Sequence, residues 1–242
     1  SSDLRADIVT LTIFVNPTQF GPNEDFSKYP RDLEKDKQLA LTAGVDYCFI
    51  PSNEEMYANP NYTFVDLHTI TDVLEGAVRP GHFRGVATVV AKLFNITKPH
   101  VAVFGQKDAQ QVAVIQRMAK DLNFDVEIIV APTVRERDGL AMSSRNVYLS
   151  PAERKESIVL SQSLKKAEEL ILSGERSCSA IRAEMMKCFA AAPSAQIEYV
   201  SIADYETLKE YSEVKNDDHV LISLAVRIGT TRLIDNTIIH IP

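Results

Sequence analysis

Three short polar segments each come directly after a predicted strand, and they carry residue types that can bind an anionic ligand. They are residues 16–20 (NPTQF), residues 105–108 (GQKD) and residues 133–146 (TVRERDGLAMSSRN). If the three preceding strands are parallel neighbours, their carboxyl ends share one edge of a sheet. We therefore expect the three segments to converge on one crevice, with the amide of Gln19 directed into it.

The GQKD segment combines features of a phosphate site. Gly105 lets backbone approach a ligand closely, and the helix predicted from Asp108 offers unpaired N–H groups to an anion. Lys107 adds a full positive charge suited to phosphate oxygens. Asp108 can accept hydrogen bonds from ribose hydroxyls or cap the following helix, and the residues alone leave both readings open.

The MSSRN segment supplies further donors from consecutive residues. Ser143 and Ser144 carry hydroxyls, and Arg145 carries a planar guanidinium, directly after Met142. A guanidinium of this kind suits the charge that develops on a transferred phosphoryl group. The alternative for Arg145 is a salt bridge at a domain junction.

Three more polar residues are candidates for binding a ligand that carries a carboxylate. Gln111 lies near the first turn of the predicted helix, and its amide can serve a ligand with hydroxyls and a carboxylate. Arg79 and His82 flank a Pro-Gly turn and could form one wall of an anion site. The alternatives are a solvated helix position for Gln111 and ordinary surface charge for the other two.

Several function classes lose support from composition and missing motifs. The net charge of -7 argues against nucleic-acid binding, and no apolar run reaches the roughly 20 residues that span a bilayer. Neither GxxxxGK[ST] nor GxGxxG occurs, and no His or Cys spacing predicts a protein-bound metal. Three scattered cysteines indicate a reducing compartment, so we expect a soluble cytoplasmic protein.

Strands and helices alternate through the first half of the chain. The predicted strands are residues 7–15, 47–51, 100–105 and 126–132, with a possible edge strand at 63–67, and the predicted helices are 32–44, 85–97 and 108–123. The run at residues 10–15 has the composition of a strand buried on both faces. This alternation predicts an α/β fold with a parallel sheet and helices on both faces.

The pattern changes after Pro132. A polar loop is followed by a capping box at Ser150, a helix that continues to about Leu172, and a second helix over roughly Ala180–Ala191. Residues 197–204, 219–226 and 231–241 then predict a small antiparallel sheet. We place a domain boundary near Pro132.

Four motifs in this order resemble the pantothenate synthetase (pantoate–β-alanine ligase) family of the nucleotidyltransferase superfamily. They are FVNPTQFGPNEDFSKYPRDLEKD, LEGAVRPGHFRGVATVVAKLFNI, FGQKDAQQ and PTVRERDGLAMSSRNVYLS. The resemblance runs from about Ala6 to the RLIDN segment near the C-terminus, which is nearly the whole chain.

The resemblance implies an ATP-dependent ligase. Pantoate attacks the α-phosphate of ATP, pyrophosphate leaves, and β-alanine then attacks the bound pantoyl adenylate to give pantothenate and AMP. It also implies a Rossmann-like doubly wound parallel sheet in residues 1–132, a smaller, lid-like C-terminal α+β domain in residues 133–242, and a homodimer. Any Mg²⁺ should arrive on the ATP phosphates.

The resemblance also implies roles for the candidate residues. Gln19 and Gln111 would hold pantoate, with Gln19 also near β-alanine and with Arg79 and His82 at the edge of the pocket. The ATP site would be lined by Gly105, Gln106, Lys107, Asp108, Val134, Met142, Ser143, Ser144 and Arg145. Of these, Lys107 and the three residues Ser143, Ser144 and Arg145 would act on the phosphates.

One family feature is missing from the sequence. The family begins with a strand and a His-x-Gly-His loop that contacts ATP. Neither occurs in this sequence, which opens at Ser1, just before what should be the second strand of the family. We expect that the sequence omits an N-terminal stretch, and that a chain truly this short would adenylate weakly or not at all. The alternatives are a catalytically impaired ligand-binding protein and another nucleotidyltransferase of the superfamily.

Overall fold

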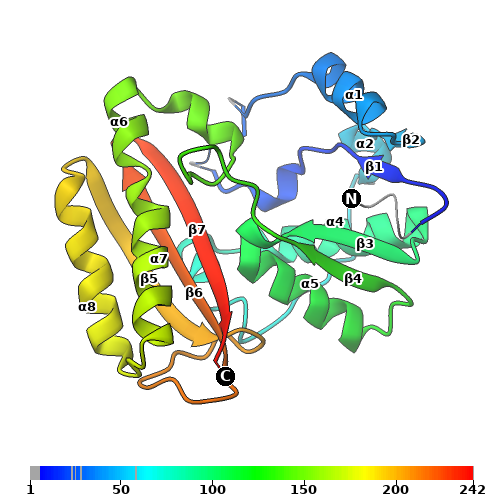
Figure 1. The fold of residues 1–242 in the computed structure, drawn as a ribbon. Helices are drawn as coiled ribbons and strands as arrows, with labels where there is room; N and C mark the ends of the chain where they lie inside the picture. The colour runs from blue at the N-terminus through cyan, green and yellow to red at the C-terminus, as the bar shows by residue number, and fades with distance from the viewer. Residues whose placement is uncertain (1–5, 23, 25, 28, 58, 242) are drawn as a thin grey trace. The chain divides into compact units, whose positions relative to one another are not determined.

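A computed structural model of the chain describes residues 6–22, 24, 26–27, 29–57 and 59–241. The chain divides into two compact units (Figure 1). Unit 1 comprises Ser1–Phe104 and Val114–Ile129, and unit 2 comprises Gly105–Ala113 and Val130–Pro242. Strands and helices alternate in the first half of the chain, and a parallel strand pair is present, so the fold is α/β as predicted.

Unit 1 contains a parallel strand pair connected through a helix. Strand β1 (Thr10–Thr12) pairs in parallel with β2 (Tyr47–Phe49), and helix α1 (Leu33–Thr42) lies between them in the sequence. The carboxylate of Asp32 caps α1, and Gly44 follows the helix with a φ of 78°, a conformation that favours glycine. The predicted strand–helix–strand order is confirmed.

Helix α4 (His82–Thr97) provides much of the buried apolar surface of unit 1. It begins three residues before the predicted start, and Phe83, Val86, Ala87 and Phe94 on it are buried. Short helices α2 (Asn53–Met56) and α3 (Glu75–Val78) and the 3₁₀ turn η2 (Pro17–Gln19) complete the helical elements before it.

Strands β3 (Val101–Gly105) and β4 (Glu127–Ala131) are hydrogen-bonded neighbours in a second two-stranded sheet. The connection between them runs through the 3₁₀ turn η3 (Gln106–Asp108) and helix α5 (Ala109–Asp121). Asp108 directly precedes α5. The predicted strand and helix order over this part of the chain is confirmed.

Two expectations for unit 1 are wrong. Residues 63–67 form no strand, because the N–H of Val65 donates to the hydroxyl of Thr88 on α4, over 3.0 Å, and the segment runs beside a helix. The run at residues 10–15 is not buried on both faces, since Thr10, Leu11 and Thr12 are exposed. Among the described strands β1 has β2 as its single hydrogen-bonded neighbour, so little covers it.

Unit 2 contains a three-stranded antiparallel sheet in the order β5 (Ala195–Asp204), β6 (His219–Ile228), β7 (Thr231–His240). A two-residue connection joins β6 to β7, and its Gly229 has a φ of 57°, as a tight hairpin requires. The predicted small antiparallel sheet is confirmed.

Helices α7 (Val159–Leu172) and α8 (Cys178–Cys188) pack side by side on one face of this sheet (Figure 1). The core between them includes Leu160, Ile181 and Met185 from the helices and Ile222 and Leu224 from β6, all at most 1% exposed. Burial of such side chains stabilises the unit by about 1.5–3 kcal/mol each.

The predicted single helix after Pro132 is interrupted. The capping box is confirmed, with the hydroxyl of Ser150 accepting from the N–H of Glu153, but α6 (Pro151–Glu156) ends before α7 begins. The buried hydroxyl of Ser157 donates to the carbonyl of Arg154 over 2.8 Å, and such local bonding competes with helix continuation. A 3₁₀ turn, η5 (Phe189–Ala191), extends α8.

The segment predicted as a polar loop contains a tight hairpin. Arg135 and Ala141 form an antiparallel bridge, and Gly139 turns the chain with a φ of 98°. A 3₁₀ turn, η4 (Ser144–Tyr148), follows.

Of the helices in the described ranges, none has both the length and the apolar composition needed to cross a membrane.

Candidate active site

Gln19 is held by a buried asparagine in unit 1. Asn16 is 2% exposed, and its side-chain oxygen accepts from the backbone N–H and the hydroxyl of Thr18 and from the hydroxyl of Tyr57. A backbone N–H can only donate, so this atom must be the oxygen. The amide nitrogen of Asn16 therefore donates to Gln19 Oε1 and to the carbonyl of Gly85, each over 3.1 Å.

This arrangement fixes which way the Gln19 amide faces. Its oxygen is engaged by Asn16, so the Gln19 NH₂ group is the end available to a ligand. The backbone of α4 packs closely against the same turn at Gly85. A Cβ at this position would lie 2.4 Å from the carbonyl oxygen of Thr18. A glycine is required wherever backbones approach this closely.

Arg79 and His82 also contact Gln19, through its backbone. His82 Nδ1 lies 2.8 Å from the Gln19 carbonyl oxygen, and an Arg79 nitrogen lies 3.4 Å from it. A second Arg79 nitrogen lies 3.0 Å from His82 Nε2. Since arginine only donates and a carbonyl only accepts, His82 is the neutral tautomer with its proton on Nδ1.

The charge of Arg79 in this cluster is paired with a carboxylate. Arg79 makes a two-pronged ion pair with Glu24, at 2.7 Å for both contacts. Burial and the neighbouring Arg79 lower the pKa of His82, which keeps the ring neutral. Burial alone would raise the pKa of Glu24, but the hydrogen bond and charge of Arg79 outweigh it and lower that pKa.

The predicted substrate contacts of Arg79 and His82 remain predictions, and the structure adds a second part for both. Their donors meet at the Gln19 carbonyl, so they hold the turn that carries the Gln19 side chain. The cationic wall expected from Arg79 is offset by Glu24, which the sequence reading did not include.

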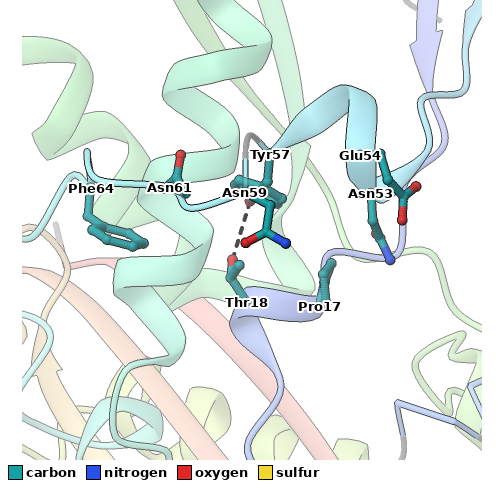
Figure 2. Close-up of a pocket in the computed structure, with 8 residues that line it drawn as sticks. All are labelled: Pro17, Thr18, Asn53, Glu54, Tyr57, Asn59, Asn61 and Phe64. Atoms are coloured by element: carbon teal, nitrogen blue, oxygen red, sulfur yellow. Dashed lines mark hydrogen bonds between the residues drawn. The ribbon is translucent and has the colours of Figure 1, made fainter.

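An open hollow of about 340 Å³ lies beside the same turn (Figure 2). Figure 2 shows Thr18 and Tyr57 facing each other across it, joined by a hydrogen bond of 3.3 Å. Its lining is Pro17, Thr18, Asn53, Glu54, Tyr57, Asn59, Asn61 and Phe64. This lining contains none of the predicted site residues.

In unit 2 the GQKD segment is fastened to β7. The side-chain nitrogen of Asn236 donates to the carbonyls of Gln106 and Lys107, over 2.9 and 2.8 Å. The Gln106 amide returns a bond to Asn236 Oδ1 over 3.3 Å. The predicted residues Gly105, Gln106, Lys107 and Asp108 thus form one short turn at the start of α5, with Gln111 on the following helix turn.

The preceding residue of β7 holds the hairpin. Asp235 is 2% exposed and accepts two bonds from Arg135, at 2.7 and 3.0 Å. The hydrogen bonds that Arg135 donates to Asp235 are the main cause of a raised Arg135 pKa, so the guanidinium stays charged. Strand β7 therefore contacts both the hairpin and the GQKD turn through consecutive residues.

The hairpin presents an exposed apolar pair. The N–H of Met142 donates to the carbonyl of Val134 over 2.9 Å, and the two residues are 56% and 66% exposed. Arg154 on α6 holds the outer part of the hairpin through Glu136 and Asp138, at 2.6 and 2.7 Å. The predicted ATP residues Val134 and Met142 are therefore neighbours on a supported turn.

The hydroxyl and guanidinium residues follow at once. Ser143 Oγ accepts from the backbone N–H of Arg145 over 3.2 Å, which starts η4. Asn146 donates to Glu136 and to the carbonyl of Ala141, so η4 is bonded to the hairpin. Ser143, Ser144 and Arg145 thus lie on one turn, and β7 contacts this turn as well.

The predicted site residues fall into two groups. Gln19, Arg79 and His82 come together in unit 1, and Gln111 with the predicted ATP residues comes together in unit 2. The predicted meeting of the two groups in one crevice remains a prediction.

In the part of the chain that the structure describes, no cluster of three or more His, Cys, Asp or Glu could hold a metal ion.

Sequence reasoning missed Asn16, Asp235 and Asn236. Asn16 was assigned no role of its own from the sequence, although an asparagine before proline can bond the next turn through its side chain. Asp235 and Asn236 are adjacent in the middle of a strand, so their side chains face opposite sides of the sheet and at least one of them needs a buried partner. This adjacent polar pair was the available signal.

Comparisons with known proteins agree with the motifs. The sequence model of the family described as pantoate-beta-alanine ligase matches residues 1–238. The pantothenate synthetase of Acetivibrio thermocellus is 57% identical over 235 residues, covering 97% of this chain and 83% of the relative. That of Roseiflexus castenholzii is 59% identical over 234 residues, covering 97% and 84%.

Solved structures give the same result. A pantothenate synthetase of Thermus thermophilus has a TM-score of 0.92 at 45% identity, covering 98% of this chain and 85% of that one. The pantoate-beta-alanine ligase of Francisella tularensis, solved with beta-gamma ATP and β-alanine, has a TM-score of 0.74 at 34% identity, covering 97% and 80%. From its sequence motifs, its fold and these matches, the chain is a ligase that belongs to the pantoate–β-alanine ligase family.

Proposed function

We propose that the protein joins pantoate to β-alanine in two steps, through a pantoyl adenylate, with ATP as the third substrate. The observation that carries this proposal is the family match over residues 1–238. The ATP and β-alanine bound in the Francisella tularensis relative support both substrates. The two groups of polar residues described above supply chemistry of the required kind.

In the first step a carboxylate oxygen of pantoate attacks the α-phosphorus of ATP. The new oxygen–phosphorus bond forms as the bond to the bridging oxygen breaks, and pyrophosphate leaves. Because two anions must meet, the main tasks are positioning and charge neutralisation. Lys107, Arg145 and the N-terminal turn of α5 supply positive charge and donors, with the hydroxyls of Ser143 and Ser144 beside them.

The nucleotide base and sugar need different partners. The exposed pair Val134 and Met142 offers an apolar surface for the adenine ring, and Asp108 can accept from ribose hydroxyls. Gly105 and Gln106 complete the turn next to the phosphates. Mg²⁺ would come bound to the phosphates and keep several waters, because it favours that mode over protein cages.

Pantoate carries hydroxyls and a carboxylate, and amides suit both. The Gln19 NH₂ group can donate to the pantoate oxygens, and Gln111 can donate or accept. Arg79 and His82 lie at the edge of this site and fix the Gln19 backbone. In the second step the amine of β-alanine attacks the acyl carbon, loses a proton, and AMP leaves with the bridging oxygen.

Larger-scale features are part of the same proposal. We infer a Rossmann-like doubly wound sheet in residues 1–132 for the substrates, and a lid-like α+β domain in residues 133–242 that keeps water from the adenylate. A homodimer in the cytoplasm completes it. The high structural similarity to the Thermus thermophilus protein supports the architecture.

The test separates the two steps. The native protein, mixed with ATP and pantoate alone, should release pyrophosphate, and AMP should appear when β-alanine is added. Pyrophosphate that appears only after β-alanine is present would contradict the adenylate. Binding of ATP or pantoate by calorimetry with no pyrophosphate under any condition would instead indicate a ligand-binding protein.

A further inference from the structure

Asn236 of β7 makes the contacts that fix the GQKD turn. Its NH₂ group donates to two consecutive backbone carbonyls, those of Gln106 and Lys107, and it is 2% exposed. Its oxygen accepts from the Gln106 side chain over 3.3 Å. These contacts direct both ends of the buried amide at residues 106–107.

The alternation of side chains along β7 explains how Asn236 reaches this turn. Leu233 and Ile239 face the helix-covered core, whereas Asn236 has the opposite parity in the strand. Its direct cross-strand neighbour is Ser223, which pairs in turn with Ser201. A short polar row therefore crosses the sheet on the face away from α7 and α8.

Asn236 is the member of this row that bonds η3. The hydroxyls of Ser201 and Ser223 are buried and have no hydrogen-bond partner among residues 6–241 as far as these are described. Both serines are small and lie on β5 and β6, farther from η3 in the strand order. The longer side chain of Asn236 on β7 reaches the carbonyls of the turn, whereas the short serine side chains on β5 and β6 make no such bond.

Pinning these two carbonyls has a consequence for the neighbouring N–H groups. In a planar trans peptide the C=O of one residue and the N–H of the next point in opposite directions. With the Gln106 carbonyl directed at Asn236, the N–H of Lys107 points away from β7, whereas the N–H of Asp108 closes the 3₁₀ turn onto the Gly105 carbonyl. The backbone donor of Lys107 is then aimed away from the sheet, beside the positive N-terminal end of α5.

We propose that Asn236 is a positioning residue for the ATP phosphates. It orients the backbone donor of Lys107 toward the phosphate site and keeps the turn from relaxing when no nucleotide is bound. This role rests on the proposed function, in which the GQKD turn binds ATP. It acts through the backbone, so Asn236 itself need not touch the nucleotide.

The test compares Asn236→Asp with a matched control, Ser223→Ala. Aspartate has nearly the same shape but cannot donate to the two carbonyls, and its charge repels them. Ser223→Ala alters the adjacent buried position on the same face, where the hydroxyl has no partner in the described structure. Affinities for ATP and for pantoate are measured separately by calorimetry, together with the melting temperature and amide hydrogen exchange of residues 105–111.

For Asn236→Asp we expect the dissociation constant of ATP to rise at least tenfold and that of pantoate to stay within twofold. Exchange of the 105–111 amides should accelerate without nucleotide. Ser223→Ala should leave both affinities and this exchange unchanged. Asn236→Ala, which removes the amide without adding charge, should repeat the split between ATP and pantoate and serves if the aspartate variant does not fold.

The outcomes separate a failure of the role proposed for Asn236 from a failure of the proposed ATP site. Unchanged ATP affinity and unchanged exchange in both Asn236 variants would overturn the inference alone. Parallel loss of ATP and pantoate binding, tracking a lower melting temperature, would assign Asn236 a purely structural role. Wild-type protein that binds no ATP would overturn the proposed ATP site, and the inference with it.

Discussion

The side-chain amide of Asn16 donates to Oε1 of Gln19 over 3.1 Å, and this contact decides which end of the Gln19 amide faces a ligand. Asn16→Asp replaces that donor with an oxygen, which would face the oxygens of Gln19 and Gly85. We expect a loss of about 2–3 kcal/mol in the free energy of unfolding, and pantoate affinity at least tenfold weaker as the Gln19 amide reverses. Calorimetry with pantoate and denaturant unfolding measure the two effects.

The control for this variant is Tyr57→Phe. It removes the bond to the Asn16 oxygen and the longer bond to the Thr18 hydroxyl but keeps both Asn16 donors, so it should cost about 1–2 kcal/mol of stability and leave pantoate affinity unchanged. Equal weakening of pantoate in both variants would show that the Gln19 orientation does not matter.

Gly85→Ala tests the close approach of α4 to the turn at residues 17–19. The new Cβ would lie 2.4 Å from the Thr18 carbonyl oxygen and 2.8 Å from the Gln19 Cα, so the turn must shift. Although alanine favours a helix over glycine by about 1 kcal/mol, we expect net destabilisation of about 1–3 kcal/mol and weaker pantoate binding.

Ala91→Gly on the same helix is the matched control. It lowers helix propensity without touching the turn, so it should reduce the melting temperature and leave pantoate affinity intact. If Gly85→Ala bound pantoate as tightly as the wild type, the turn would not be part of the pantoate site.

His82 predicts a pH dependence of stability. Burial and Arg79 lower its pKa in the folded protein, against the partial opposition of the Gln19 carbonyl, Glu24 and Glu75. The unfolded chain therefore takes up the proton first, and the stabilising contribution is present above about pH 6.5 and is lost as the pH falls through the lower folded pKa. The lowered pKa of Glu24 acts only below its ordinary value of 4.5, outside this window.

The measurement is the free energy of unfolding between pH 7.5 and pH 5 for the wild type and for His82→Gln. The glutamine can still donate to the Gln19 carbonyl but does not titrate, so its curve should be flatter. His68→Gln, at an exposed position, should keep the wild-type slope. A His82→Gln curve as steep as the wild type would contradict the assignment.

Lys107→Ala and Arg145→Ala should slow adenylate formation by about 100-fold each in the native protein, while pantoate affinity changes little. Loss of one donor at developing charge typically has this effect. Gln111→Ala should show the reverse, with weaker pantoate binding as its main effect. Single-turnover pyrophosphate release and pantoate calorimetry measure the two quantities, and near-normal single-turnover rates in both cation variants would end this assignment.

Much of the fold was predictable because local signals agreed with the tertiary structure. The capping box at Ser150, the apolar spacing of α4 and the three C-terminal strands each have short-range causes. The exposure of β1 and the absence of a strand at residues 63–67 depend on what packs beside them, here the Thr88 hydroxyl in the second case. Periodicity carries no information about such neighbours.

The candidate site was predictable in its ligand-facing residues and not in their supports. Lys107 and Arg145 stand out because each is a cation beside other polar residues, in a segment suited to binding phosphate. Asn236 supports the GQKD turn through a bond to Lys107, which lies 129 residues earlier in the sequence. Neither segment contains a local pattern that predicts this pairing. The carboxylate of Glu24, which offsets Arg79, is likewise visible only once the chain is folded.

The central claim is that the pantoate carboxylate attacks the α-phosphate of ATP before the amide bond forms. Pantoate labelled with ¹⁸O in its carboxylate tests this directly, with the native protein, unlabelled ATP, β-alanine and mass spectrometry of the products. The account predicts one ¹⁸O atom in the phosphate of AMP for each pantothenate made. AMP without the label, or label found in inorganic phosphate alongside ADP, would contradict it.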